Sequence, residues 1–375
     1  MNAQTQLRRA PATSAPRLRP AALPSRVLVL AATSKMPYRV AQCLAAEGVQ
    51  VFAIGGRRAR GLRFSKRIEG FVPTRAEVDG SASYALILEV NAAIASYGIE
   101  LVVAGDALAT RSLIAMRNRL AAPCFPMPDL PVFDLLNDKA RFHELCLNLG
   151  VDVPKTRLFE TRDAFRDALA RGEFDTAQIA KPLSMTGSEG CLRVDLDSPE
   201  TALARINYAP VLVQDFIEGE DIGTSALCRA GEIRAFVAHR YRRNTYQTFY
   251  DERIYAVVER IARATNYDGV FNFDMRLTPD GRILYLECNP RIFLKIAMSM
   301  FAGVNFIALG AGRRAPVEPY LCPSTQVRLP KAFALSALTR GRVDARSWRA
   351  TRYLLGDPMF YAREELGWEE DRQLG

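Results

Sequence analysis

The chain has 375 residues and a hydrophobic content of 49%, the size and composition of a globular protein with two or three domains. Its net charge of +9 comes almost entirely from arginine. Beyond the first 25 residues these arginines are dispersed, which argues against a nucleic-acid-binding stripe. Seven cysteines without metal-finger spacing indicate free thiols in a reducing compartment, so we expect a cytoplasmic protein. With only two histidines, a histidine-rich metal site is excluded.

The first 25 residues are rich in proline, alanine and arginine without apolar periodicity, so we predict a disordered tail. They lack the continuous apolar core of a secretory signal, and an organelle transit peptide is the weaker alternative. The one stretch long enough to span a membrane is Ile292–Gly312. Because it contains Lys295, Asn305 and three glycines, we expect a buried helix and loop there, and no membrane association.

From residue 26 onward the chain predicts alternating strands and helices. Strands are expected at 26–32, 49–55 and 99–105, with helices at 33–48 and, after a loop, 83–97. This pattern is Rossmann-like, and Asp106 follows the third strand, where open α/β sheets bind ligands. The first turn between strand and helix, residues 31–35, lacks G-x-G-x-x-G, so dinucleotide binding is not expected.

Four prolines in residues 121–133 predict a domain boundary. Asn137 or Asp138 then caps a helix, which places Lys139 in its first turn. A short strand at 175–183 carries Lys181 near its end and leads into the loop SMTGSEGC, followed by a return strand. A lysine that leaves a strand into such a loop can place its ammonium on a nucleotide phosphate, whereas an ordinary turn is the simpler interpretation. The P-loop motif is absent.

Residues 211–217 predict an apolar strand that runs into an acidic corner ending at Asp221. Its backbone could contact the rim of an adenine, and an acid a few residues later could bind ribose hydroxyls. The next two strands are joined by a turn at Ala230-Gly231. The segment 240–250 mixes arginine and tyrosine, and we expect a loop whose aromatics either pack locally or face a substrate.

Residues 268–292 predict a β-hairpin with its turn at 278–281. Asp274 and Glu287 lie on opposite arms, and Asn289 shares the strand face of Glu287. Two carboxylates and an amide oxygen suit Mg²⁺ with bound phosphates. Arg291 is next on that face and could neutralise a transferring phosphoryl group. Each residue alone is most simply a surface charge, but Glu287 lies within an apolar run, where a carboxylate without a cation is costly.

The order of these features resembles the ATP-grasp superfamily over residues 137–312, and the preceding α/β segment resembles its pre-ATP-grasp domain. The thirteen-residue separation of the two acids is similar to the D-alanine–D-alanine ligase branch. The run Glu-Cys-Asn-Pro-Arg resembles the E-x-N-P-R signature of the carbamoyl-phosphate synthetase and amino-acid ligase branches. The chain departs from the pattern at Asn272, where relatives often carry arginine, at Asp215, and in its small number of loop glycines.

The resemblance implies a role for each matching residue. The expected ATP-binding residues are Lys139, Lys181, Gly187, Ser188, Gly190, Gln214, Asp215, Ile217 and Asp221. Within that set the two lysines would contact the phosphates of ATP, and the glycine loop would close over these phosphates. The backbone of Asp215 and Ile217 would bind adenine, with Gln214 alongside. Asp221 would bind the ribose. The expected metal ligands are Asp274, Glu287 and Asn289. Arg291, Lys181 and Asn289 would act in catalysis, with Arg291 stabilising an acyl phosphate.

The implied activity is ATP-dependent ligation, in which a carboxylate is phosphorylated and then attacked by an amine, with release of ADP. The implied cofactors are ATP and Mg²⁺ or Mn²⁺, and the partners are a small carboxylate and an amine. A homodimer is a family-level expectation. Two alternatives remain: activation of bicarbonate, although no biotinyl Met-Lys-Met occurs, and a regulatory ATP-binding protein without catalysis.

We therefore expect four regions. They are the tail at 1–25, a pre-ATP-grasp α/β domain at 26–133, an ATP-grasp domain at 134–315 and a C-terminal extension at 316–375. The ATP-grasp domain would contain a glycine-loop subdomain at about 151–213 and a metal-binding subdomain at about 214–315. The extension matches no known pattern beyond a strand at 326–329 and a helix at 331–339.

Overall fold

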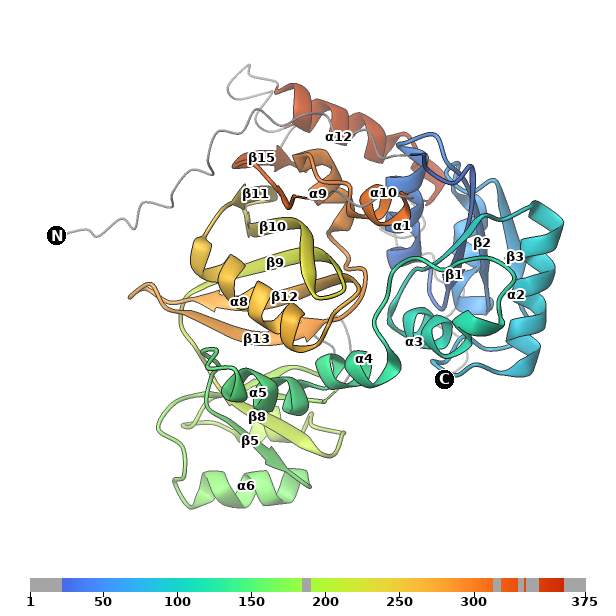
Figure 1. Ribbon diagram of the computed structural model, residues 1–375. Coiled ribbons are helices and arrows are strands. Elements are labelled where there is room, and N and C mark those ends of the chain that lie inside the picture. The colour runs from blue at the N-terminus through green and yellow to red at the C-terminus, as the bar shows by residue number, and fades with distance from the viewer. Residues whose placement is uncertain (1–21, 184–189, 313–317, 330–333, 335–343, 361–375) are drawn as a thin grey trace. The chain divides into compact units, whose positions relative to one another are not determined.

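The structure is a computed structural model that describes residues 22–183, 190–312, 318–329, 334 and 344–360 (Figure 1). The chain divides into two compact units. Unit 1 comprises the chain up to Leu130, Thr224–Asn272 and the chain from Pro290. Unit 2 comprises Pro131–Gly223 and Phe273–Asn289, so the β-hairpin that ends at Asn289 belongs mostly to unit 2.

Unit 1 begins with a parallel four-stranded sheet in the order β3-β2-β1-β4 (Figure 1). Its elements are β1 (Arg26–Ala31), α1 (Lys35–Ala45), β2 (Gln50–Gly55), the 3-10 helix η1 (Arg57–Phe64), β3 (Gly70–Pro73), α2 (Tyr84–Tyr97), β4 (Leu101–Ala104), α3 (Ala107–Met116) and η2 (Arg117–Arg119). Val27 and Val29 of β1 pack against Val40 and Leu44 of α1 in one core. The predicted Rossmann-like layer is confirmed, but the expected loop between β2 and α2 contains η1 and β3.

The expected ligand position at Asp106 is filled by the chain itself. The Oδ2 atom of Asp106 accepts hydrogen bonds from the backbone N–H groups of Ala32 and Thr33, both at 2.9 Å, and from Thr33 Oγ1 at 3.2 Å. Its Oδ1 atom accepts from Ala109 N at 3.0 Å and thereby caps α3. Because the Asp106 carboxylate already accepts from the backbone N–H groups of this turn, these groups are not available to a phosphate, in agreement with the missing glycine motif.

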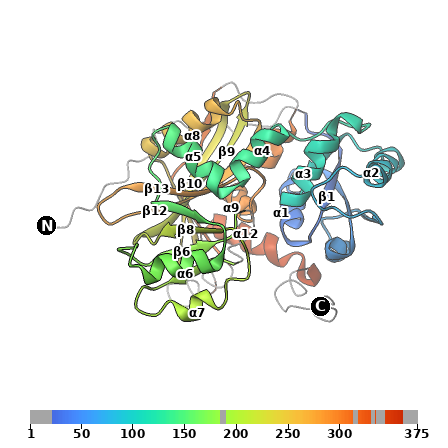
Figure 2. The same ribbon diagram turned by 90° about the horizontal axis from the view of Figure 1, so that it is seen from below.

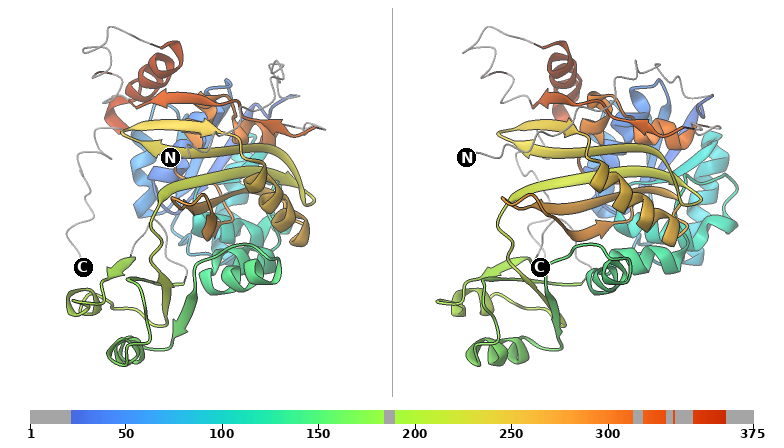
Figure 3. Two further views of the ribbon diagram at one scale, coloured as in Figure 1. Left: turned by 90° about the vertical axis from the view of Figure 1, so that its left-hand side faces the viewer. Right: turned by 60° about the vertical axis from the view of Figure 1, so that its left-hand side comes forward.

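A second sheet has seven strands in the described part of the chain. Its path is β13-β12-β9-β10-β11-β15, and β14 pairs with β10. The elements are β9 (Glu220–Arg229), β10 (Glu232–Arg242), β11 (Thr245–Phe249), α8 (Glu252–Ala264), β12 (Gly269–Leu277), β13 (Ile283–Asn289), α9 (Ile296–Ala302), α10 (Phe306–Ala311), β14 (Tyr320–Leu321) and β15 (Thr325–Arg328). Helix α8 lies along one face of this sheet (Figure 3). On the other face α9 and α10 share a core with Val237 and Tyr246.

The segment 240–250 was expected as a loop and is a hairpin instead. Strand β10 continues to Arg242, and Arg243 and Asn244 turn the chain with φ angles of 46° and 58° into β11. Left-handed residues at both central positions match the twist of two antiparallel strands. Tyr246 packs into the core and not into a local surface cluster, since it is fully buried and its hydroxyl lies 2.8 Å from Ser299 Oγ of α9.

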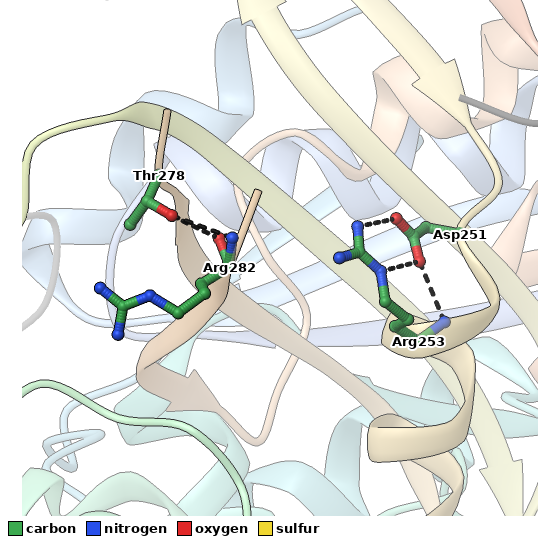
Figure 4. Close-up of polar contacts among 4 residues, drawn as sticks. All are labelled: Asp251, Arg253, Thr278 and Arg282. Atoms are coloured by element: carbon green, nitrogen blue, oxygen red, sulfur yellow. Dashed lines mark hydrogen bonds and ion pairs between the residues drawn. The ribbon is translucent and has the colours of Figure 1, made fainter. Parts of the chain in front are cut away.

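Local hydrogen bonds fix the ends of α8 and of the β12–β13 hairpin (Figure 4). Asp251 caps α8 by accepting from Arg253 N at 2.9 Å, and its carboxylate also binds the Arg253 guanidinium. In the hairpin, the Oγ1 atom of Thr278 accepts from Arg282 N at 2.9 Å. Gly281 N donates to Thr278 O, which closes the predicted turn.

Unit 2 holds an antiparallel four-stranded sheet in the order β5-β8-β6-β7. Its elements are α4 (Leu130–Asn137), α5 (Lys139–Asn148), β5 (Thr156–Phe159), α6 (Arg162–Ala170), β6 (Gln178–Lys181), β7 (Leu192–Val194), α7 (Glu200–Leu203) and β8 (Val211–Asp215). Phe165 of α6 and Leu203 of α7 pack with Val211 and Val213 of β8, so both helices cover one face of this sheet (Figure 2).

The C-terminal part of unit 1 contains a helix that we did not expect, α12 (Ala345–Leu355). Tyr353 Oη donates to Gln42 O at 2.6 Å, and the buried Asp357 accepts from Ser65 Oγ at 2.5 Å. The expected strand at 326–329 is present as β15, whereas the helix expected at 331–339 lies outside the described residues. Ile292–Gly312 forms the buried helices α9 and α10, and none of the described helices is long and apolar enough to cross a membrane.

Candidate functional site

The β12–β13 hairpin brings the three predicted metal ligands together in unit 2. Asp274 lies on β12, and Glu287 and Asn289 lie on β13, where a spacing of two residues puts them on one face. Asn289 Nδ2 donates to Asp274 Oδ2 at 3.1 Å. The side chain of Asp274 also adjoins the Glu287 carboxylate. The predicted cluster of two carboxylates and one amide is therefore present.

Both predicted phosphate lysines reach the same strand. Asp138 caps α5 by accepting from Ala140 N at 2.9 Å, which starts the helix at Lys139. Lys139 Nζ lies 3.5 Å from Glu287 Oε2. Lys181, the last residue of β6, donates from Nζ to Leu286 O at 3.4 Å. Helix α5 and strand β6 thus deliver two ammonium groups to the carboxylates of the hairpin.

Burial and charge shape the titration of this cluster. Burial, together with the nearby Lys139, lowers the pKa of Lys181 to about 8, and Glu287 only partly offsets this. Burial alone would raise the pKa of Glu287, but Lys139 and Lys181 outweigh it, so that this pKa lies below its ordinary value. The carboxylate is therefore ionised at neutral pH, and Lys181 is poised to lose its proton in mild alkali.

The glycine loop can be placed only at its end. Gly187 and Ser188 lie outside the described residues. Gly190 has a φ of +72°, and its carbonyl accepts from Tyr208 Oη at 2.7 Å. Cys191 follows beside Lys181, and burial raises the pKa of its thiol although both lysines oppose this. This cysteine is therefore a protonated thiol near the cluster.

The predicted adenine-binding segment begins on β8, which is an interior strand of its sheet and not the edge strand that we expected. Strand β8 lies between β5 and β6 and ends at Asp215, so residues 216–219 form a connection. Gln214 is buried, Asp215 N donates to Lys155 O at 3.0 Å, and Asp215 Oδ1 accepts from Gln178 Nε2 at 3.0 Å. The N–H of Asp215 is therefore already used, and only its carbonyl is a candidate contact for a base.

Asp221 and its surroundings include residues that the sequence analysis missed. Asp221, on β9, forms an ion pair of 2.9 Å with Arg276 Nη1 from β12. Arg276 also donates to Gly219 O at 3.3 Å, and the Phe216 ring lies beneath the guanidinium of Arg193 at 4.1 Å. Arg276 follows Asp274 by two residues, so both side chains lie on the same face of β12. This spacing is the sequence signal from which Arg276 could have been predicted.

Two further positions named in the sequence analysis, the predicted Arg291 and the departure at Asn272, belong to unit 1. Arg291 is buried, and its Nη1 donates to Ile292 O at 3.3 Å. Asn272, where an arginine occurs in relatives, donates to Thr224 O at 2.8 Å and to Ser225 Oγ at 3.1 Å. Asn272 is thus a structural residue that ties β12 to β9.

The hairpin cluster fits a hard divalent cation by its chemistry. Two carboxylates and an amide are the oxygen ligands that Mg²⁺ and Mn²⁺ prefer. To ligate through its amide oxygen, Asn289 would exchange its hydrogen bond to Asp274. Among the described residues no group of three histidine, cysteine, aspartate or glutamate side chains gathers as a metal site, so a cation here would complete its shell with phosphate oxygens or water.

Solved structures of known proteins share this fold. One is the biotin carboxylase domain of the 2-oxoglutarate carboxylase of Hydrogenobacter thermophilus, which is 17% identical with a TM-score of 0.59, covering 80% of this chain and 72% of that chain. The N5-carboxyaminoimidazole synthetase of Staphylococcus aureus is 12% identical with a TM-score of 0.60, covering 84% and 86%. The L-amino acid ligase of Bacillus licheniformis is 15% identical with a TM-score of 0.55, covering 77% and 74%.

The shared fold, with a parallel layer followed by antiparallel sheets, is the ATP-grasp fold that the sequence predicted. Residues 207–329 match the family model described as ATP-grasp in the biosynthetic pathway with Ter operon. No curated protein matches the chain by sequence.

Proposed function

We propose that the protein is an ATP-dependent, ADP-forming ligase that phosphorylates a carboxylate and joins the resulting acyl group to an amine. The observation that carries this proposal is the cluster on the β12–β13 hairpin, in which Lys139 and Lys181 face Glu287 beside Asp274 and Asn289. Two buried ammonium groups beside two half-buried carboxylates suit a polyphosphate held with a divalent metal.

The residues of unit 2 would bind the nucleotide. Lys139 and Lys181 would contact its phosphates, with Gly190 at the end of the covering loop. Gln214, the Asp215 carbonyl and the Ile217 N–H would bind adenine, and Asp221 would bind ribose. Gly187 and Ser188, outside the described residues, keep the phosphate-covering role that the resemblance implies.

Asp274, Glu287 and Asn289 would hold Mg²⁺ or Mn²⁺, which neutralises phosphate charge and fixes the phosphate geometry when bound. Binding of ATP with this cation would separate Lys139 from Glu287, because both groups would exchange their mutual contact for the ligand. The ion pair in the ligand-free chain therefore pairs the buried ammonium of Lys139 with the half-buried carboxylate of Glu287 until the ligand replaces this contact.

In the reaction a carboxylate oxygen attacks the γ-phosphorus and the bond to ADP breaks, giving an acyl phosphate. The amine then attacks the acyl carbon and phosphate leaves. Arg291 would stabilise the acyl phosphate. The chain connection supports this role, because only Pro290 separates Arg291 from Asn289, and their Cα atoms can be at most about 7 Å apart. The protein contributes position and charge neutralisation, and no covalent nucleophile is needed.

An acid screen tests this proposal. Purified protein is mixed with Mg²⁺, ATP, hydroxylamine and pools of carboxylic acids, with bicarbonate as a separate arm, and ADP, AMP and acyl hydroxamate are quantified. We expect ADP and hydroxamate in equal amounts with one group of acids. ADP formation with bicarbonate alone would replace the proposal by carboxyphosphate chemistry. Tight binding of ATP without any turnover would favour a regulatory protein.

A further inference from the structure

Helix α12 of unit 1 and the residues after it expose large apolar side chains that none of the predicted roles uses. Trp348 and Leu355 are 51% and 53% exposed, and Met359, which follows the helix, is 60% exposed. Because Trp348 and Leu355 are seven residues apart, they lie on the same side of α12. The opposite side of the helix packs into unit 1. Three exposed apolar side chains within twelve residues indicate a contact surface.

The end of α12 adjoins the 3-10 helix η1 and the segment that follows it. The buried Asp357 accepts hydrogen bonds on Oδ2 from Ser65 Oγ at 2.5 Å and from Lys66 N at 3.1 Å. The Phe360 ring shares a core with buried residues of η1 and of α1. The exposed residues on either side of Asp357 therefore lie next to the exposed residues of η1.

This region has an excess of positive charge. Residues 57–67 contain six basic residues and no acid, a local concentration that we did not recognise in the sequence. The side chains that are exposed and form no ion pair within the described part of the chain include Lys35, Arg58, Arg60, Arg63 and Lys66. Arg349 and Arg352 of α12 share both properties. We call these cations, together with the three exposed apolar side chains, the basic–apolar surface.

The acids of this region are already bound or lie at its margin. Asp357 is fully buried, and Asp344 at the start of α12 pairs with Arg328. The exposed acids that are closest in sequence to these segments are Glu47 and Glu69. Positive charge therefore prevails at the basic–apolar surface, which favours a partner that presents negative charge and apolar groups together.

From this combination we infer that the basic–apolar surface binds an anionic phospholipid membrane. Unpaired arginine and lysine side chains attract anionic headgroups, and protruding tryptophan, leucine and methionine side chains enter the boundary between headgroups and acyl chains. This inference departs from our sequence-based expectation of no membrane association, and it is independent of the proposed function.

Other polyanions fit this surface less well. A nucleic acid would pair with the cations through its phosphates, but it offers no aliphatic environment to Leu355 and Met359. An acidic protein would need a fixed shape that matches the surface. The headgroups of a fluid bilayer can move to each unpaired cation, and the acyl chains below them receive the apolar side chains.

Co-sedimentation of the full-length protein with lipid vesicles tests the inference. One set of vesicles is phosphatidylcholine alone, and in the other phosphatidylglycerol replaces part of it. We expect at least about tenfold tighter binding to the anionic vesicles at about 0.1 M NaCl, and a fall toward the level of the neutral vesicles at about 0.5 M. The full-length chain is used because residues 361–375 add five acids and two arginines to its charge. Equal binding to both sets would overturn the inference.

A charge variant locates the contact on the molecule. Arg60→Gln combined with Arg63→Gln removes two cations of the surface and should weaken binding to anionic vesicles at least about tenfold. Arg75→Gln combined with Arg205→Gln removes the same charge from exposed positions elsewhere in the chain and should change binding by less than about twofold. Equal weakening by both pairs would mean that net charge determines binding, and the assignment of this surface would fall.

An apolar variant separates a membrane from other polyanions. Leu355→Gln combined with Met359→Gln keeps every charge and should weaken binding to anionic vesicles at least about fivefold, with circular dichroism unchanged because both side chains are exposed. In a Trp368→Phe background Trp348 is the only tryptophan, and its emission should shift to shorter wavelength when anionic vesicles are added. Unchanged vesicle binding or unshifted emission would overturn the inference. Tighter binding of an oligonucleotide duplex than of anionic vesicles would assign the surface to nucleic acid instead.

Discussion

Two carboxylate sites of this protein, one buried and one half-buried, have opposite designs. In unit 1, Asp106 accepts hydrogen bonds from three backbone N–H groups and one hydroxyl, all of them fixed by the ends of strands and helices. In unit 2, Glu287 is balanced by lysine side chains, and Asp274 accepts from the amide of Asn289. Backbone donors cannot leave without unfolding, whereas side chains can rotate away. The first carboxylate is therefore structural, and the second pair can exchange its partners for a ligand.

The sequence offered both the turn after β1 and the β12–β13 hairpin as candidate ligand sites. The difference in their hydrogen-bond partners explains why only the hairpin suits ligand binding. The turn after β1 would be an anion site in many α/β sheets, but the chain supplies its own anion there. The hairpin holds two carboxylates whose partners are side chains, lysine beside Glu287 and the amide of Asn289 beside Asp274. Changes to Asp106 should therefore affect stability, and changes to the hairpin cluster should affect turnover.

The largest expected effect is on the hairpin. Glu287→Gln removes one negative charge from the metal ligands, and we expect ADP formation to fall by at least about 1,000-fold because the cation and the phosphates lose a fixed partner. Circular dichroism should remain unchanged. Asp280→Asn, at the exposed turn of the same hairpin, is the matched control and should keep turnover. Normal turnover of the Glu287 variant would remove the metal assignment.

The second prediction concerns the structural carboxylate. Asp106→Ala leaves three N–H donors without their acceptor, and we expect the free energy of unfolding of unit 1 to fall by about 3 kcal/mol. Asp106→Asn retains acceptor oxygen and should lose less. Urea unfolding gives the stability, and ADP formation at low temperature should stay within about twofold of the original rate per folded molecule. A stable protein with lost turnover would reverse the comparison.

A pH titration tests the exchangeable lysine. The pKa of Lys181 is about 8 in the ligand-free chain. If its ammonium contacts phosphate, the affinity for ATP with Mg²⁺ should fall up to about tenfold per pH unit above pH 8, because the protein must then take up a proton to bind. Lys181→Arg stays protonated and should show a flat profile over the same range. A sloping profile in the arginine variant would assign the titration to another group.

The same lysine affects folding in the absence of ligand. Its folded pKa of about 8 lies below the ordinary value of 10.5, so between these pH values the unfolded chain binds more protons than the folded chain. The Lys181 contribution to stability therefore rises with pH in this window, up to about 3 kcal/mol, and is absent below pH 8. Comparison of urea unfolding between the original chain and Lys181→Met at pH 7 and pH 10 isolates it. A larger gain with pH in the methionine variant would contradict the burial of this charge.

The smallest expected effect is at the exposed end of the nucleotide segment. Asp221→Asn should raise KM for ATP about fivefold and leave kcat unchanged, since a charged acceptor for ribose hydroxyls is lost far from the reacting phosphate. Arg276→Lys keeps the positive partner of Asp221 and should change KM less. Equal KM values for ATP and for its 2′,3′-dideoxy analogue in the original chain would contradict a ribose contact.

The parts of the fold that repeat a strong local pattern could be predicted from the sequence. The apolar run of β1, the Ser83 cap of α2 and the turn at residues 278–281 each have a local physical cause, and each appears in the structure. Strand β3 and the hairpin at 240–250 could not be predicted so easily. Their residues are only half-buried or mix arginine with tyrosine, so the pairing partner decides their structure.

The candidate site likewise has residues that could be predicted from local sequence patterns and residues that could not. Asp274, Glu287 and Asn289 follow from strand alternation, and the cap at Asp138 predicts the position of Lys139. The contact of Lys181 with the backbone of Leu286 joins two segments that are more than a hundred residues apart, which local patterns cannot reveal. The ion pair of Arg276 with Asp221 likewise depends on tertiary packing.

The most direct test of the account follows oxygen from the acid into phosphate. A carboxylic acid from the active pool, labelled with ¹⁸O in its carboxylate, is converted with ATP, Mg²⁺ and hydroxylamine, and the released phosphate is analysed by mass spectrometry. Transfer of one labelled oxygen to inorganic phosphate, together with ADP, is the predicted result, because the acyl phosphate keeps an oxygen of the acid. Label in AMP, or phosphate without label, would contradict the acyl-phosphate mechanism.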